Sequence, residues 1–179
     1  PLWSRGLGDV YKRQKQARPE GNYMIKDKTD AADLLAQLVP WLAQYAPQIG
    51  HAVKLTKFSV GQSNPTYELV TEQGHYVLRA QPVGVLLKSA HAVDREFRVM
   101  AALDGTAVPV PKMIAECHDS DVIGRKFFVM EKVTGKAVFD PALADYTAAD
   151  RVRLYHKQTD ILAALATLDP VAIGLDGFG

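Results

Sequence analysis

The chain has 179 residues, of which 47% are hydrophobic and 23% are charged, as in ordinary soluble globular domains. No apolar run approaches the ~20 residues that a membrane span needs, and we expect neither a membrane segment nor a signal peptide. The sequence has one cysteine and therefore no internal disulfide, which fits a cytoplasmic protein. The formal net charge is +1, which gives little support to a nucleic-acid-binding function.

The first residues are set apart by their sequence. Residues 4–14 read SRGLGDVYKRQ and resemble the translation of a transposon-end adapter used in sequencing libraries. We therefore interpret residues 1–14 as not native and exclude them from fold reasoning. This segment carries three cationic and one acidic side chain, a charge of +2, which leaves −1 for the remaining chain. We expect no nucleic-acid and no membrane partner, and we interpret residues 15–29 as a flexible lead-in.

A helical pattern follows over residues 30–50. Leucines and aromatic residues recur there at helical spacing, and Asp30 is a plausible N-cap. Pro40 interrupts the pattern. Since proline removes a backbone donor, we expect a kink, or two short helices with Pro40 early in the second.

Residues 51–135 are predicted to form a sheet with one helix. The stretches AVKLTKFSV, TYELVT and YVLRAQ are short and rich in β-branched and aromatic residues, and the turn EQGH joins the last two. SAHAVDREFRVMAALDG then predicts a helix, with Ser89 as its cap and Gly105 at its end. KMIAEC and KFFVMEKV predict two further strands, so the order is β-β-β-α-β-β and the fold class is α+β.

Beyond this region, residues 136–179 predict the start of a second, helical lobe. The sequence TAAD at Thr147 is similar to a helix capping box. A long helix should follow, and we expect its apolar face to need a partner. That face is formed by Leu154, Tyr155, Gln158, Ile161, Leu162, Leu165 and Leu168.

The predicted order of strands and helix is that of the small lobe of protein-kinase-like folds. In such a lobe a cation on the third strand holds the ATP phosphates, and a glutamate on the helix orients it. Arg79 and Glu96 occupy these two positions, and arginine can form two parallel hydrogen bonds to the carboxylate. The alternative is that both residues are ordinary surface charges.

Two backbone segments are further candidates for nucleotide binding. Gly61, Gln62, Ser63 and Asn64 lie between the first two predicted strands, where a tight turn could hold phosphate through its N–H groups. Their pattern is weak, because glycine, serine and asparagine are also common in ordinary hairpin turns.

The last predicted strand could serve as the hinge that binds adenine. Glu131 and Val133 would offer backbone groups to the adenine edge, and Met130 would pack behind the ring. The alternative is a core strand that runs into a loop.

Several stretches together resemble one family. GQSNPTYELV, YVLRAQPVGVLLKSAHAVDREFRVMAAL, VPVPKMIAECHDSDVIGRKFFVMEKVTG and GLDGFG are similar to the aminoglycoside phosphotransferase and choline kinase superfamily. They are most similar to the kinase-like domains attached to some acyl-CoA dehydrogenases. The resemblance implies a protein-kinase-like fold, ATP with Mg2+, and transfer of the γ-phosphate to a small-molecule hydroxyl.

The chain departs from that family's pattern in two ways. Ala166 stands where the family commonly has a histidine. The catalytic loop H-x-D-x-x-x-x-N and the later metal-binding aspartate of the family lie downstream of the matched region. The resemblance thus implies no catalytic base and no metal ligand in this chain, and we expect the chain alone to be an inactive fragment.

The resemblance leaves the acceptor open between a hydroxyacyl-CoA, an aminoglycoside, choline and a sugar, with a weak preference for an acyl-CoA-linked hydroxyl. The oligomeric state also stays open. A non-catalytic, nucleotide-binding pseudokinase or interaction module is the second hypothesis, and an unrelated α+β binding domain is the third.

Overall fold

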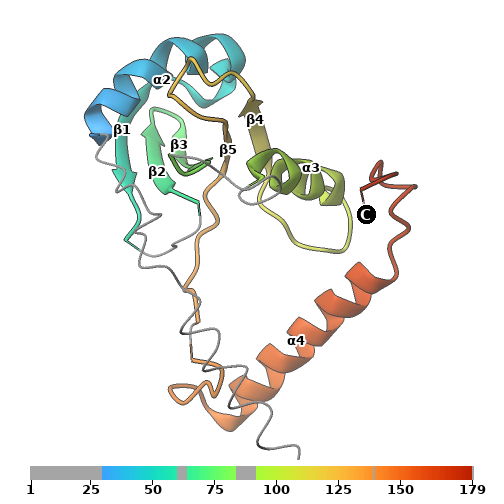
Figure 1. Cartoon of the computed structure of the whole chain (residues 1–179). Helices are drawn as coiled ribbons and strands as arrows, with labels where there is room; N and C mark the ends of the chain where they lie inside the picture. Colours follow the sequence, from blue (N-terminus) through green and yellow to red (C-terminus); the bar gives the residue numbers. More distant parts are fainter. Residues whose placement is uncertain (1–29, 60–63, 84–91, 139, 179) are drawn as a thin grey trace, which may run out of the picture.

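The fold is built on a five-stranded antiparallel sheet (Figure 1). A computed structural model describes residues 30–59, 64–83, 92–138 and 140–178. The strand order is β1-β2-β3-β5-β4, so the predicted three-strand meander and the two further strands are confirmed. The strand bounds are β1 Ala52–Lys57, β2 Thr66–Thr71, β3 Gly74–Ala80, β4 Met113–Cys117 and β5 Phe127–Glu131.

The helix α2 (Ala31–Tyr45) covers one face of the sheet (Figure 1). Asp30 caps it as predicted, and its Oδ1 accepts a hydrogen bond from the Ala32 N–H at 3.1 Å. The expectation of two short helices is wrong, because α2 continues through Pro40. Leu38 and Trp41, on either side of Pro40, are buried, and packing of such a face can outweigh the helix-breaking tendency of one residue. A short 3₁₀ helix, η1 (Pro47–Ile49), leads on to β1.

The hydrophobic core lies between α2 and the sheet. The Trp41 ring meets the Phe127 ring edge-on at 4.8 Å, and Leu78 and Val129 are fully buried in the same cluster. Cys117 also belongs to this core, and burial raises the pKa of its thiol.

The helix α3 (Val93–Leu103) lies against the sheet beside β4 and β5 (Figure 1). Its N-cap is Ala92, which makes no side-chain capping bond. The prediction of Ser89 as the cap is therefore wrong, and Ser89 itself lies outside the described residues. Gly105 follows the helix end with a positive φ of +77°, a conformation that glycine adopts without strain.

The helix α4 (Ala148–Ala166) runs apart from the sheet (Figure 1). Thr147 caps it as predicted, and its Oγ1 accepts the Asp150 N–H at 3.1 Å. None of the residues of α4 is buried among the residues that the structure describes. Its predicted apolar face is therefore uncovered there, with Leu162 57% and Leu165 46% exposed.

Candidate functional site

Arg79 lies near the end of β3, on the sheet face opposite α2. Its neighbours in the strand, Leu78 and Ala80, are fully buried in the α2 core, and successive side chains of a strand point to opposite faces. Arg79 pairs in register with Phe128 of β5, whose ring meets the Phe97 ring of α3 at 5.8 Å. Arg79 therefore leaves the sheet on the face that α3 packs against.

Glu96 of α3 binds Arg79 through two nearly parallel contacts. The Arg79 Nε donates to Glu96 Oε2 at 2.5 Å, and Nη2 donates to Oε1 at 3.2 Å. The side chains are 28% and 36% exposed, so water screens the pair and its contribution to stability is small. What the double contact supplies is orientation, because it fixes the plane of the guanidinium. The structure thus brings together the two residues that the sequence paired.

Two residues of the β2 end complete this network. Asn64 is 3% exposed, and its Nδ2 donates to Glu96 Oε1 at 2.9 Å. The Thr66 hydroxyl accepts from Arg79 Nη1 at 3.1 Å and donates to the Asn64 carbonyl at 3.0 Å. Glu96, Arg79, Thr66 and Asn64 therefore form a closed ring of hydrogen bonds. In the structure, the Asn64 side chain contacts the carboxylate of Glu96, and its predicted contact with phosphate stays a prediction.

Sequence reasoning missed Thr66, although a signal for it was present. The predicted turn EQGH pairs Thr71 with Gly74. Counting back along this antiparallel register places Thr66 opposite Arg79, as the structure has it. The hairpin register was therefore sufficient to find this residue.

The geometry leaves Arg79 able to bind an anion. A guanidinium has five N–H donors, and the contacts to Glu96 and Thr66 use one donor from each of the three nitrogens. Among the described residues, the second N–H of Nη1 and that of Nη2 stay available to an anion, and the ring of bonds holds them in a fixed direction.

An apolar strip lies next to Arg79 on the same face. Val77, two residues before Arg79 in β3, is 8% exposed and pairs with Met130 of β5. Met130 lies two residues after Phe128, so it shares the face of Arg79. A flat, apolar ring could pack on these two side chains with its charged substituents toward Arg79.

The other predicted hinge residues lie at the end of β5. The Glu131 N–H donates to the Lys112 carbonyl at 2.8 Å, so this donor is occupied within the sheet. Val133 follows the strand and is 68% exposed. Its predicted role stays a prediction. The predicted loop residues Gly61, Gln62 and Ser63 lie outside the described residues.

A second polar cluster marks the far end of this face. Glu68 Oε1 lies 2.5 Å from Lys132 Nζ and 2.8 Å from His75 Nδ1. These hydrogen bonds, first to Lys132 and then to His75, lower the pKa of the Glu68 carboxyl. Lys132 comes directly after Glu131, so the cluster joins the predicted hinge to β2.

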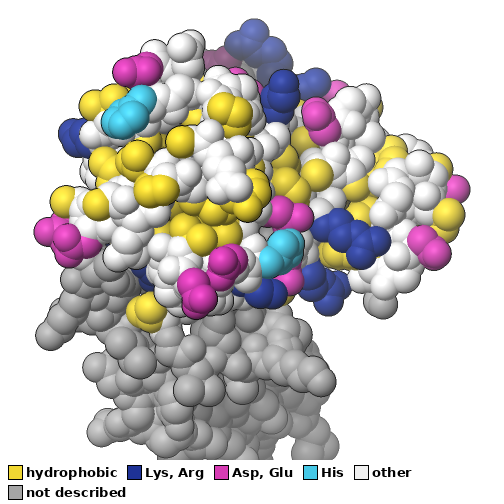
Figure 2. Space-filling view, turned by 90° about the horizontal axis from the view of Figure 1, so that it is seen from above, with side chains coloured by type: hydrophobic (Ala, Val, Ile, Leu, Met, Phe, Trp, Pro, Cys, Tyr) yellow, Lys and Arg dark blue, Asp and Glu magenta, His cyan; other side chains and the backbone are white. Residues whose placement is uncertain are grey.

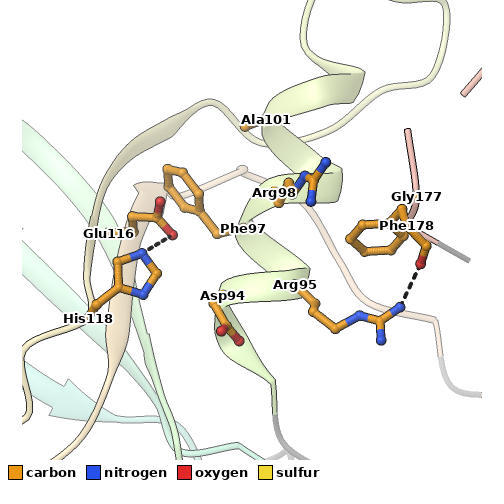
Figure 3. Close-up of a pocket in the computed structure, with 9 residues that line it drawn as sticks. All are labelled: Asp94, Arg95, Phe97, Arg98, Ala101, Glu116, His118, Gly177 and Phe178. Carbon is orange, nitrogen blue, oxygen red and sulfur yellow. Dashed lines mark hydrogen bonds and ion pairs between the residues drawn. The ribbon is translucent and has the colours of Figure 1, made fainter. Parts of the chain in front are cut away.

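A cavity of about 600 Å³ lies elsewhere, beside α3 (Figure 3). Its walls come from α3, from β4 and the following residue His118, and from the segment that contains Phe178. Arg79 and Glu96 do not line it. The candidate nucleotide site is therefore the region of Arg79, where an oriented cation lies next to an apolar strip.

Comparisons with known proteins show the family to which the chain belongs. A family model described as "Phosphotransferase enzyme family" matches residues 54–179. The chain belongs to this phosphotransferase family. A solved structure of a Ralstonia eutropha JMP134 protein, assigned as an aminoglycoside phosphotransferase, is 41% identical to this chain with a TM-score of 0.70. The match covers 80% of this chain and 41% of the Ralstonia chain. The fold is therefore the kinase-like fold of these phosphotransferases.

Curated relatives of this chain are named as acyl-CoA dehydrogenases. "Probable acyl-CoA dehydrogenase IBR3" of Arabidopsis thaliana is 44% identical over 131 residues, which is 70% of this chain and 16% of the relative. Acyl-CoA dehydrogenase family member 11 of Rattus norvegicus is 38% identical over 149 residues, which is 81% of this chain and 19% of the relative. The chain thus spans less than a fifth of the length of these relatives.

Proposed function

We propose that the chain is the ATP-binding part of a phosphotransferase that moves the γ-phosphate of ATP to a hydroxyl of a small molecule. The observation that carries this proposal is the double contact between Arg79 and Glu96, which holds a cation in one orientation with donors left for phosphate. An oriented cation needs no rearrangement when the negatively charged phosphates bind. Positioning and stabilisation of charge are the main requirements of phosphoryl transfer.

Each described residue of the site has a part in this proposal. Arg79 binds the ATP phosphates, and Glu96 orients Arg79. Val77 and Met130 pack against the adenine ring, and the backbone of Glu131 and Val133 meets its polar edge. Residues 61–63 would add backbone N–H groups to the phosphates.

Mg2+ belongs to the proposal without a residue assigned to it. ATP-dependent transfer of this kind uses Mg2+, but no group of three or more His, Cys, Asp or Glu side chains among the described residues could hold a metal ion. The proposal places neither a catalytic base nor a metal ligand in this chain. In the part of the chain that the structure describes, no helix has the length and apolarity to cross a membrane. A cytoplasmic location belongs to the proposal.

The acceptor in the proposal is a hydroxyl linked to an acyl-CoA. Its support is that several relatives are named as acyl-CoA dehydrogenases. The proposal includes no nucleic-acid or membrane partner, since the face seen in Figure 2 mixes acidic and basic side chains without one dominant sign of charge.

The test is calorimetric titration of ATP into the 179-residue chain and its Arg79→Ala variant. We expect Arg79→Ala to weaken ATP binding about 10- to 100-fold, since a hydrogen bond to a charged group contributes roughly 1.5–3 kcal/mol. Arg153→Ala is the matched control, because Arg153 is 78% exposed on α4 and pairs with Asp150 alone among the described ion pairs. Equal ATP affinity in the Arg79→Ala variant and the unmodified chain would remove the proposal's basis.

A second candidate function is nucleotide binding without transfer. Ala166, at a position where the family commonly has histidine, favours it. Phosphate transfer by the longer protein that contains this chain, measured as ADP formation dependent on an added hydroxyl compound, would exclude it. ATP binding without any such transfer would support it.

A further inference from the structure

The segment of residues 174–178, here called the brace, lies along the outer side of α3 (Figure 3). The Arg95 Nη2 donates to the Phe178 carbonyl at 2.9 Å, and its guanidinium lies 4.6 Å from the centre of the Phe178 ring. Arg98 Nη2 donates to the carbonyls of Gly174 at 3.2 Å and Asp176 at 3.4 Å. Two arginines of α3 therefore bind three carbonyls and one ring of the brace.

The backbone of the brace is shaped to present these carbonyls. Gly174 and Gly177 have φ angles of +79° and +65°, which glycine reaches without the strain that a side chain would cause. The Phe178 N–H donates to the Leu175 carbonyl at 3.1 Å, which closes the turn that contains Gly177. The brace is thus an ordered structure held by its own bonds as well as by α3.

The helix α3 has few other anchors among the described residues. It has 11 residues, and only Val93 and Leu103, its first and last residues, are buried. Its N-cap residue makes no side-chain bond, and so short a helix is not stable by itself. On its inner side Phe97 contacts Phe128, and at its start Lys126 Nζ lies 3.5 Å from Asp94 Oδ2.

The brace and the nucleotide site hold different sides of this helix. Arg95 and Arg98 are three residues apart and therefore share one side, whereas Glu96 points away from them toward Arg79. A side chain at the surface of a helix about 10–12 Å wide moves roughly 1 Å when the helix turns by about 10°. Such a shift would break the contacts of Glu96 with Arg79, which measure 2.5 and 3.2 Å.

We propose that Arg95, Arg98 and Phe178 are positioning residues for phosphate binding: by gripping the brace they set the rotation of α3 at which Glu96 orients Arg79. This inference rests on the proposed function, because its effect is felt through the ATP phosphates. It makes the segment after α4 a part of the nucleotide site that touches no nucleotide. A shift of the brace then changes ATP affinity through the orientation of Arg79, without any substitution of Arg79.

The test compares ATP and adenosine binding in brace variants. Arg95→Ala and Phe178→Leu should each weaken ATP binding about three- to tenfold, since the apparent affinity falls with the fraction of molecules that have the competent helix position. Adenosine binding should not change, because adenosine carries no phosphate for Arg79. Phe178→Tyr keeps the ring over Arg95 and should bind ATP as tightly as the unmodified chain. Arg153→Ala is again the neutral control.

A double-mutant cycle separates positioning from general destabilisation. In the Arg79→Ala background, Arg95→Ala should have no further effect on ATP affinity, because it acts through Arg79. The positioning role is refuted if ATP affinity is unchanged in both Arg95→Ala and Phe178→Leu, or if adenosine affinity falls as much as ATP affinity. It is also refuted if Arg95→Ala still weakens ATP binding in the Arg79→Ala background.

A second measurement needs no nucleotide and so separates this inference from the proposed function. Amide hydrogen exchange across α3 should speed up in Phe178→Leu and stay unchanged in Arg153→Ala. If the unmodified chain binds no ATP but α3 exchange speeds up as expected, the proposed function fails and the grip of the brace on α3 stands. If exchange in α3 is unchanged in Phe178→Leu, the brace does not hold the helix. The inference then fails regardless of the ATP affinity of the variants.

Discussion

Thr66 shows how one hydroxyl can connect two functional side chains. It accepts from Arg79 and donates to the backbone of Asn64, so it couples the β3 cation to the segment that enters β2. Thr66→Val keeps the β-branched shape and removes both bonds. We expect a loss of about 1 kcal/mol in the free energy of unfolding and weaker ATP binding, measured by denaturant titration and calorimetry.

The control for this variant is Thr56→Val on β1, whose side chain is exposed. This change should alter neither quantity. If Thr66→Val binds ATP as tightly as the unmodified chain, the third contact of Arg79 is not needed for its orientation.

The Glu68 carboxyl provides a pH prediction at the same scale. Hydrogen bonds from Lys132 and His75 lower its pKa in the folded chain. A lowered folded pKa means that this contribution to stability is complete above the unfolded pKa and is lost as the pH falls through the folded pKa. Lys132→Ala should therefore raise the Glu68 pKa toward its ordinary value, as measured by NMR titration of its carboxyl carbon. An unchanged pKa would show that the ion pair with Lys132 does not form in solution.

At the scale of elements, α2 contains an unfavourable residue at an exposed position. Pro40 lies inside the helix with its side chain exposed. Pro40→Ala should stabilise the chain by about 1–2 kcal/mol, because an interior proline costs roughly 3 kcal/mol and part of that gain is offset by the looser unfolded chain. Pro47→Ala, at the favoured first position of η1, should not stabilise it. A less stable Pro40→Ala variant in thermal unfolding would mean that the α2 core needs the proline.

The sequence could predict the elements whose signals are local. Strands such as Thr66–Thr71 show alternating hydrophobicity and lie between turn residues. The helix with Glu96 directly follows the strand with Arg79 in the chain, so the contact between these two residues follows from topology. The brace could not be predicted in this way. Its bonds to Arg95 and Arg98 span 83 and 76 positions, and no short pattern marks a contact between residues so far apart. At Pro40 the sequence left a kink and two short helices open, and packing of the buried α2 face explains why the helix continues.

At the scale of the whole molecule, the described residues divide into a packed sheet lobe and an uncovered helix. Leu38 of α2 is fully buried, whereas Leu162 of α4 is 57% exposed. Leu38→Ala should cost about 2–5 kcal/mol in the free energy of unfolding, and Leu162→Ala should change it by less than about 0.5 kcal/mol. Denaturant titration of both variants checks this. A large loss in Leu162→Ala would show that α4 packs against a surface within the chain.

We propose that the sheet lobe holds Arg79 ready for phosphate, and this claim can be tested at Arg79 itself. The most direct measurement is the NMR signal of the Arg79 Nε–H group, assigned by its disappearance in Arg79→Lys and followed during titration with ATP and with adenosine. We predict that ATP shifts this signal and that adenosine leaves it in place. An Arg79 signal that does not move while ATP binds would contradict the central claim that Arg79 holds the nucleotide phosphates.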